Sequence, residues 1–141
     1  MKPMSRSVTP YLTVKGAAEA IAFYQKAFGA KEEMRMPAQD GKRLMHAHLT
    51  INDGQVFLSD EFPEHDASRA PTAANPPPVA VALAYDQPAE VDATFQRAIE
   101  AGATSMLEPS DQFWGARFAM LTDPFGHRWM LNAPLAQGAA T

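Results

Sequence analysis

The chain has 141 residues, no cysteine and a formal net charge of −4, with 12 Lys and Arg against 16 Asp and Glu. This length suffices for one domain with its own core, and the lack of cysteine excludes disulfides, thiol nucleophiles and thiolate metal sites. No cluster of Lys and Arg is dense enough to follow a row of phosphates, so we expect no nucleic-acid partner. The first residues lack the apolar segment of a signal peptide, and no apolar run is long enough to cross a bilayer. We therefore expect a cytoplasmic protein without membrane contact.

The first part of the chain predicts a strand, a helix and three more strands, over residues 8–14, 17–28, 31–36, 44–51 and 55–61. In the helix, apolar residues recur from Ala17 to Phe28 at spacings of four, three and four, which places them on one face. Gly29 follows as a left-handed cap that ends the helix. The run Asn52-Asp53-Gly54 favours a tight turn that joins the last two strands as a hairpin.

Residues 62–78 break this pattern. Pro63, Pro71 and the run Pro76-Pro77-Pro78 remove backbone donors and exclude a regular helix or a central strand, so we interpret the segment as a linker. The same order of elements then returns, with a strand over 79–85 and a helix over 89–101 that ends at Gly102. Three strands follow, near 104–107, 116–122 and 127–132.

The two halves also match residue by residue at a fixed offset. Identical residues stand 72 positions apart in five pairs: Phe23 and Phe95, Pro37 and Pro109, Leu49 and Leu121, Thr50 and Thr122, and Gly54 and Gly126. Such an offset without insertions indicates a duplicated unit, whose half-sheet pairs with its copy to bury a shared core. The sequence therefore predicts a single α+β domain, with module one at 8–61, the linker at 62–78 and module two at 79–133.

Two motifs accompany this duplicated βαβββ order: AFYQKAFG at residues 22–29 and DPFGH at residues 123–127. Together they resemble the vicinal-oxygen-chelate superfamily of glyoxalases, bleomycin-resistance proteins and dioxygenases over nearly the whole chain. Segments 10–12, 45–47, 58–60 and 111–115 look like its PhnB-like branch, some members of which are labelled 3-demethylubiquinone-9 3-methyltransferase. The resemblance implies two tandem modules that form a pair of half-barrels. The residues do not support methyl transfer, since no Gly-rich loop joins a first strand to a helix of a doubly wound sheet.

The resemblance also implies where a metal would be held, because the metal enzymes of this superfamily place ligands on the first and fourth strands of the modules. In this chain those positions correspond to Thr9, Leu58, Ala80 and Met130. None is a usable ligand for a hard or borderline divalent ion, since Leu and Ala have no donor atom and Met sulfur suits soft metals. A shift of one residue in the register of the fourth strand would put Ser59 at the ligand position in place of Leu58, and this would not restore a set of metal ligands. We therefore expect no metal and no cofactor.

Two histidines are the first candidates for ligand binding. His46 and His48 stand two residues apart on a predicted strand, so their side chains share one face. Two imidazoles at that spacing can hold a metal, or orient a polar ligand and move a proton. The alternative is that they are solvated or hydrogen-bonded strand residues, which we favour over the metal role because no carboxylate partner is obvious.

Asp60 and Tyr11 are further candidates, each with an open alternative. Asp60 shares its strand face with Leu58 and Val56, so its carboxylate lies either beside apolar residues that face the barrel or exposed at the strand end. Tyr11, on the first strand, either reaches a pocket with its phenol or packs in the core.

The branch-specific motif contributes Gln112, Trp114 and Arg117. An amide, a flat apolar ring and a guanidinium together suit the mouth of a pocket, where aromatic area gives affinity and polar groups fix orientation. The alternative is that Trp114 only packs and that Arg117 is a surface cation.

These expectations converge on a metal-independent, PhnB-like protein that binds a small molecule of unknown identity. The alternative is a metal-dependent lyase, isomerase or dioxygenase of the same superfamily, with His46 and His48 joined by Asp60 or Glu61 in a relocated metal site. A structural or regulatory partner protein is a third hypothesis. We expect a homodimer, because modules of this kind commonly bury a shared edge in the superfamily. The sequence leaves open whether a barrel closes within one chain or across two.

Overall fold

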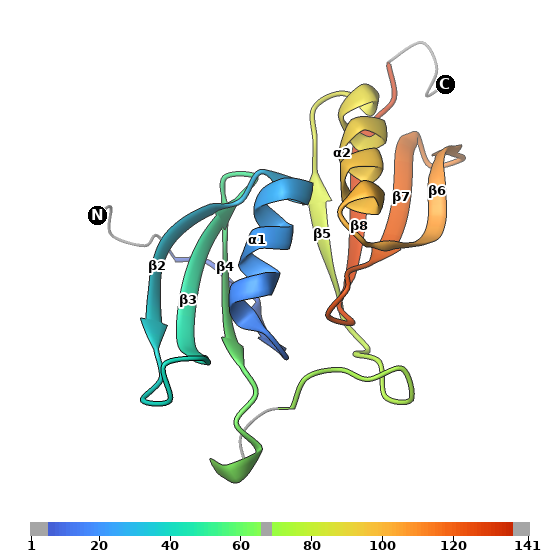
Figure 1. Ribbon diagram of the computed structural model, residues 1–141. Coiled ribbons are helices and arrows are strands. Elements are labelled where there is room, and N and C mark those ends of the chain that lie inside the picture. The colour runs from blue at the N-terminus through green and yellow to red at the C-terminus, as the bar shows by residue number, and fades with distance from the viewer. Residues whose placement is uncertain (1–5, 66–68, 137–141) are drawn as a thin grey trace.

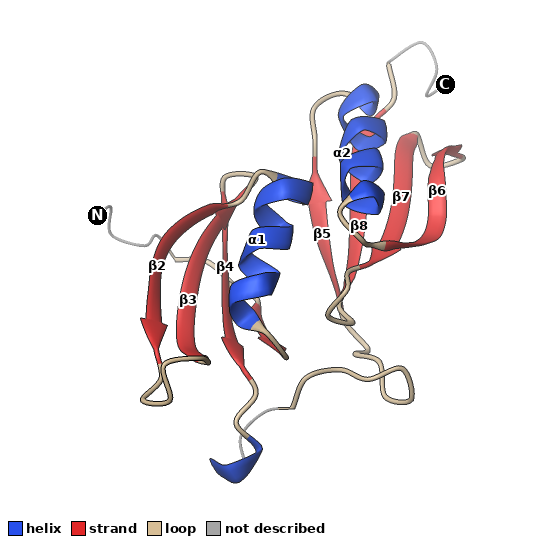
Figure 2. Ribbon diagram, viewed as in Figure 1, coloured by secondary structure: helices blue, strands red, loops and turns tan. Residues whose placement is uncertain are grey.

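The computed structural model describes residues 6–65 and 69–136, which form two four-stranded sheets, two α-helices and one short 3₁₀ turn (Figures 1 and 2). The first sheet has the order β1 (Tyr11–Val14), β4 (Gly54–Asp60), β3 (Leu44–Ile51) and β2 (Lys31–Pro37), with helix α1 (Ala17–Phe28) against it. The second has the order β5 (Ala80–Ala84), β8 (Arg128–Pro134), β7 (Ala116–Thr122) and β6 (Thr104–Gln112), with helix α2 (Pro88–Glu100). Strand β1 is parallel to β4 and β5 is parallel to β8, whereas the other neighbouring strands are antiparallel. The predicted α+β fold of two tandem βαβββ modules is confirmed.

Local sequence explains where the elements of the first module begin and end. Helix α1 buries its apolar side and ends at Gly29, which adopts φ 66° and donates its N–H to the carbonyl of Gln25. That left-handed conformation is the one that glycine adopts without a steric cost. In the turn between β3 and β4, Asn52 and Asp53 have φ of 52° and 65°, as a two-residue hairpin turn with the twist of the strands requires.

The predicted boundaries differ most from the observed ones at three strands, and by one residue at β2, β4, β5 and α2. The first strand begins at Tyr11 rather than at residue 8, because Pro10 has no N–H and contributes only its carbonyl, to the N–H of Phe57. Strand β6 runs on to Gln112, and β8 to Pro134. The edge position of β6 accommodates Pro109, since the register with β7 is irregular between Leu107 and Ser110.

Both helices lie on the same side of their sheets and pack against one another, which joins the modules through a shared core (Figure 1). Asn52, in the first hairpin turn, donates to the carbonyl of Ala84 at the end of β5. The His127 imidazole lies 2.9 Å from the carbonyl oxygen of Thr13 on β1. Among the described residues, no α-helix covers the opposite faces of the two sheets (Figure 1).

A buried carboxylate, Asp123, ties the first helix to the second sheet. The hydroxyl of Tyr24 donates to Asp123 Oδ2 over 2.6 Å, and Trp129 Nε1 donates to the same oxygen over 2.9 Å. Asp123 Oδ1 accepts from the backbone N–H groups of Phe125 and His127. Burial, followed by the nearby charge of Asp123, raises the pKa of Tyr24 well above its ordinary value, so the phenol stays protonated and donates.

The linker contacts the second module where the structure describes it. Turn η1 (Pro63–His65) directly follows the first sheet, and Thr72 and Asn75 form a small bridge. Pro71 lies so close to Gly126 that a Cβ there would come within 2.9 Å of the proline ring. Over residues 6–65 and 69–136, neither helix has the length and apolar character needed to span a membrane.

Candidate functional site

The face of the first sheet that points away from α1 carries three of the seven candidate residues. Along β3 and β4, the alternate positions from Ala47 to Ile51 and from Val56 to Asp60 are buried toward the helix. The residues between them project from the other side, because successive side chains of a strand alternate. We call this side the open face and define it by Tyr11, His46, His48 and Phe57.

The four open-face residues contact one another. The Tyr11 hydroxyl lies 3.0 Å from His46 Nδ1, and the two ring centroids are 5.5 Å apart. Phe57 packs edge-on against both imidazoles, with centroids 5.0 Å from His46 and 4.8 Å from His48. Because a phenol donates readily, the geometry favours the His46 tautomer that accepts at Nδ1 and carries its proton on Nε2.

On the open-face side of β3 and β4, two buried polar atoms have no hydrogen-bond partner within the part of the chain that the structure describes: His48 Nε2 and, next to the defined open face, Gln55 Oε1. Their strands are adjacent, with His48 opposite Phe57 and Thr50 opposite Gln55. A buried polar atom without a partner costs about 1–3 kcal/mol, so a ligand or water gains affinity there once the side chains that cover the atom move aside. The open face thus combines aromatic surface with polar atoms that still require partners.

A hollow of about 330 Å³ adjoins this face at its first strand. Tyr11 and Thr13 line one side, and the linker prolines Pro76 to Pro78 and His127 line the other. Its volume lies at the lower end of the range of small-molecule pockets, roughly 300–1,000 Å³. Tyr11 is 52% exposed, so it does not pack in the core, and its role in ligand binding stays a prediction.

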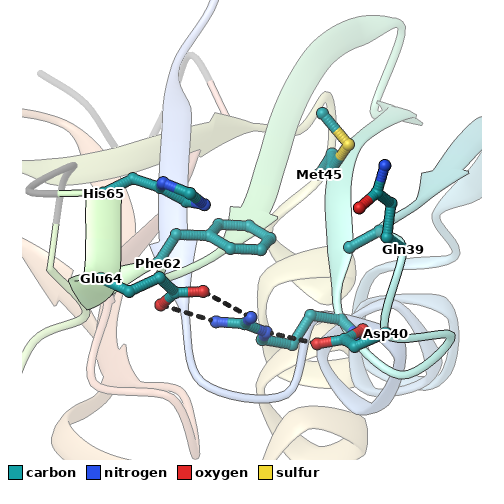
Figure 3. A pocket seen from close by; sticks show the side chains of 8 residues that line it. Gln39, Asp40, Met45, Phe62, Glu64 and His65 are labelled. Carbon is teal, nitrogen blue, oxygen red and sulfur yellow. Dashed lines mark hydrogen bonds and ion pairs between the residues drawn. The ribbon is translucent and has the colours of Figure 1, made fainter.

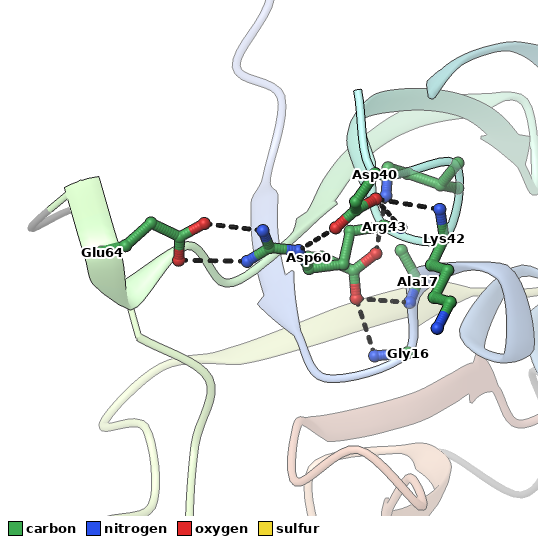
Figure 4. Close-up of polar contacts among 8 residues, drawn as sticks. Gly16, Ala17, Asp40, Lys42, Arg43, Asp60 and Glu64 are labelled. Atoms are coloured by element: carbon green, nitrogen blue, oxygen red, sulfur yellow. Dashed lines mark hydrogen bonds and ion pairs between the residues drawn. The ribbon is translucent and has the colours of Figure 1, made fainter. Parts of the chain in front are cut away.

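Asp60 lies on the opposite side of the same sheet and is only 5% exposed, which excludes the alternative of an exposed strand end. Its Oδ1 accepts from the N–H groups of Gly16 and Ala17 at the start of α1, over 2.7 and 2.9 Å (Figure 4). Its Oδ2 accepts from the N–H of Leu44 over 2.7 Å. The carboxylate therefore holds the helix start and β3 in place, and it faces away from the two histidines.

The residues of the branch-specific motif, Gln112, Trp114 and Arg117, lie on the second module, apart from His46 and His48 of the same chain. Arg117 forms ion pairs with Asp92 of α2, over 3.0 Å, and with Asp111, over 3.1 Å. The Gln112 amide donates to the hydroxyl of Ser110, and Trp114, 54% exposed in the turn after β6, packs edge-on against Phe118. The structure thus brings together Tyr11, His46 and His48 but leaves this group on the other module.

The residues present do not fit the divalent metal of the superfamily's enzymes. Leu58, expected on the site face, is 0% exposed and packs under α1, so the expected register at the fourth strand is wrong by one residue. The open face has Phe57 and Ser59 at that level, and a phenyl ring offers no donor. Within residues 6–65 and 69–136, no three His, Cys, Asp or Glu side chains are grouped so that they could hold a metal ion.

An ionic cluster next to the start of β3 was not predicted from the sequence. Arg43 donates through Nε to Asp40 over 2.7 Å and through Nη2 to Glu64 over 2.6 Å, which fastens turn η1 to the β2–β3 loop (Figure 4). We call this cluster of Asp40, Arg43 and Glu64 the Arg43 latch. The Asp-Gly turn at residues 40–41 signals the loop, but the partner Glu64 lies 21 residues away across the linker boundary.

The latch lowers the pKa values of both its carboxyl groups. The hydrogen bond from Arg43 holds the pKa of Glu64 at about 2, against an ordinary 4.5. The backbone N–H groups of Arg43 and Lys42, followed by the Arg43 guanidinium, lower the pKa of Asp40. The two carboxylates in turn raise the pKa of Arg43, with Glu64 the larger cause.

We expect the Glu64 midpoint in a carbon-13 NMR titration to move back toward 4.5 in the Arg43→Met variant. Because the folded-state pKa is depressed, the stabilisation from this pair is fully present above pH 4.5 and is lost as the pH falls through about 2. Added salt should narrow the difference in the Glu64 midpoint between wild type and variant, since the ion pair is exposed to solvent. Identical Glu64 midpoints in the two proteins at low salt would contradict the assignment.

Comparisons with known proteins agree with this architecture. The family model of the Glyoxalase/Bleomycin resistance protein/Dioxygenase superfamily matches residues 7–131. The uncharacterized protein Rv0887c of Mycobacterium tuberculosis (strain ATCC 25618 / H37Rv) is 44% identical over 133 residues, which cover 93% of this chain and 76% of that protein.

Two solved structures share the fold. The PhnB protein from Bacillus cereus superposes with a TM-score of 0.69 at 20% identity, over 93% of this chain and 100% of that chain. The fosfomycin resistance protein FosX from Listeria monocytogenes, in complex with Mn(II) and 1S,2S-dihydroxypropylphosphonic acid, superposes with a TM-score of 0.68 at 17% identity, over 98% of this chain and 96% of that chain. The predicted resemblance is confirmed, and the chain belongs to the Glyoxalase/Bleomycin resistance protein/Dioxygenase superfamily.

Proposed function

We propose that this protein binds a small organic molecule on the open face of its first sheet, without a metal ion. The observation that carries the proposal is the arrangement of Tyr11, His46 and His48 around Phe57. Tyr11 and His46 form a hydrogen-bonded pair at 3.0 Å, and His48 Nε2 is buried without a partner among the described residues. Phe57 and the ring of Tyr11 supply apolar area beside these polar groups.

The same geometry indicates what the ligand should offer. When Tyr11 donates to His46 Nδ1, the His46 Nε2–H remains as a donor for an acceptor atom of the ligand. His48 Nε2 donates or accepts according to its tautomer, and Gln55 Oε1 needs a donor. A molecule with an apolar ring and both donors and acceptors on its edge therefore satisfies the face better than an aliphatic ligand.

Metal independence is supported by the side chains near the superfamily's ligand positions, since Phe57 and Ala80 have no donor atom and the sulfur of Met130 suits soft metals. The second candidate is a metal-dependent lyase, isomerase or dioxygenase in which His46 and His48 provide a relocated site. The Mn(II) in the FosX complex motivates this alternative, since FosX shares the fold.

Elemental analysis of protein purified without chelators separates the two candidates. We expect less than about 0.1 equivalent of transition metal per chain, since two imidazoles without a third side-chain ligand hold a divalent ion weakly. About one equivalent, lost in His48→Ala, would replace our proposal with the metal-dependent enzyme. A folded protein without metal supports the binder.

Ligand binding is tested by saturation-transfer NMR with a set of small aromatic and heteroaromatic compounds. For compounds bound at the open face, we expect His46→Ala to weaken binding about tenfold, which corresponds to the loss of one hydrogen bond and one ring contact. The matched control is Gln96→Ala, which removes an exposed polar side chain of α2, outside the open face. If no bound compound discriminates His46→Ala or His48→Ala from this control, the site assignment fails.

We further propose a cytoplasmic homodimer. Supporting this, the single chain leaves Tyr11 and Trp114 more than half exposed and Phe113 96% exposed, an apolar surface that a second copy would cover. Light scattering at micromolar concentration should give twice the mass of the 15.3 kDa chain. A mass of one chain would withdraw this part of the proposal.

A further inference from the structure

A second pocket, of about 570 Å³, lies between turn η1 and the loop that joins β2 to β3 (Figure 3). Phe62, Met45 and Ala38 supply its apolar wall, and His65 and Gln39 supply polar groups. The pocket contains none of Tyr11, His46 or His48. It is therefore separate from the open-face site, although Met45 directly precedes His46 on β3.

The Phe62 ring is the centre of this pocket. The Arg43 guanidinium carbon lies 4.3 Å from the ring centroid and covers one face of the ring. The imidazole of His65 lies at an angle beside it, with centroids 6.2 Å apart (Figure 3). Met45, 52% exposed, approaches from the β3 side, so a flat ring that enters here meets a phenyl, an imidazole and a thioether.

The charges around the pocket restrict what can enter. Arg43 is held by Glu64 through two nitrogens, over 2.6 and 3.1 Å, and by Asp40 through Nε. One guanidinium therefore faces two carboxylates, and the two negative charges would repel an added anion. The guanidinium on the far side of Phe62 also draws electron density away from the ring, which favours an electron-rich partner over a second cation.

We infer that this pocket is a second ligand site, which takes an uncharged, electron-rich planar aromatic ring with a hydroxyl or amine on its edge. The ring stacks against Phe62 and Met45, and its polar edge reaches the amide of Gln39 or the imidazole of His65. This site does not depend on the proposed function of the open face, because the two share no residue.

The test uses 2-naphthol as the uncharged probe and naphthalene-2-carboxylate as its anionic counterpart, at pH 8, where an ordinary imidazole is neutral. The full chain carries carbon-13 methyl-labelled methionine, and the Met45 resonance is identified by its loss in Met45→Leu. We expect 2-naphthol to shift the Met45 methyl resonance through its ring current and to leave Met106 and Met120, on the second sheet, unshifted. The anion should bind at least about tenfold more weakly.

Three variants and one control variant test the assignment. His65→Ala and Phe62→Leu should each weaken 2-naphthol binding at Met45 about fivefold or more, whereas Phe113→Leu, at an exposed aromatic on the other module, should not. Glu64→Gln should narrow the difference in affinity between 2-naphthol and naphthalene-2-carboxylate, because Arg43 then has only one carboxylate partner. His65→Ala alters only an exposed turn residue, so it tests the site even if Phe62→Leu fails to fold.

Several results would overturn this inference. One is a Met45 resonance that 2-naphthol does not move up to its solubility limit. Another is binding that is equal in wild type and His65→Ala. Equal affinities for the two probes would refute the charge argument. Failure of the open-face proposal would appear instead as an insensitivity of bound compounds to His46→Ala, so the two outcomes are distinguishable.

Discussion

Replacing Asp123 by alanine should lower the free energy of unfolding by about 3–5 kcal/mol, because the change removes the shared acceptor of a buried network. Asp123 is 4% exposed and accepts four hydrogen bonds, two from side chains and two from backbone N–H groups. In the variant the Tyr24 hydroxyl and the Trp129 indole N–H, both in fully buried side chains, lose their acceptor. The two modules lose a direct polar link at the same time.

Urea denaturation followed by circular dichroism measures this loss. Asp111→Ala is the matched control, since it removes a surface carboxylate whose ion pair with Arg117 is worth at most about 1 kcal/mol. The free energy of unfolding of Asp123→Asn, which keeps one acceptor oxygen, should lie between the values for the control and for Asp123→Ala. If Asp123→Ala were no less stable than the control, the network would not carry the stability that we assign to it.

The second large effect is expected for Asp60→Ala, which should cost about 2–4 kcal/mol of unfolding free energy. The carboxylate accepts hydrogen bonds from the backbone N–H groups of Gly16, Ala17 and Leu44. It therefore supplies an acceptor for the N–H groups at the start of α1 and links this helix to β3. With alanine, these buried donors have no acceptor in reach. The first turn of α1 should fray before the rest of the helix.

Hydrogen exchange and denaturation together test this role. We expect faster exchange at the amides of Gly16, Ala17 and Leu44, with little change in the second module. Ser59→Ala is the neighbouring control, because Ser59 projects from the opposite side of β4 and should cost less than about 1 kcal/mol. A large loss of ligand affinity in Asp60→Ala at unchanged stability would instead return Asp60 to the binding site.

Much of the fold could be predicted because the local signals agree with the tertiary structure. The observed bounds of α1, β3 and β7 coincide with the predicted ranges 17–28, 44–51 and 116–122. In each case strong periodicity is followed by a clear terminator, such as Gly29 or the Asn52-Asp53-Gly54 turn. The 72-residue offset then fixes the repeated order of elements, since the same sequence pattern specifies the same supersecondary unit twice.

The candidate site was less predictable because its geometry depends on contacts between distant residues. Strand parity placed His46 and His48 on one face, but the pairing of His46 with Tyr11 spans 35 positions and leaves no local signal. Asp60 shares parity with buried Leu58, which allowed both alternatives until the start of α1 was seen to face it. The Arg43 latch combines residues of two loops whose relative positions no periodicity encodes.

The link between Tyr24 and Asp123 has a consequence for synthesis on the ribosome. The first module is complete at Asp60, yet the acceptor for its buried Tyr24 hydroxyl is encoded 99 residues after the donor. At roughly 5–20 residues per second, this leaves the donor without its acceptor for about 5–20 s of elongation. We therefore expect a nascent chain arrested before Asp123 to pack α1 loosely and to remain sensitive to protease, with protection gained only when the second half emerges.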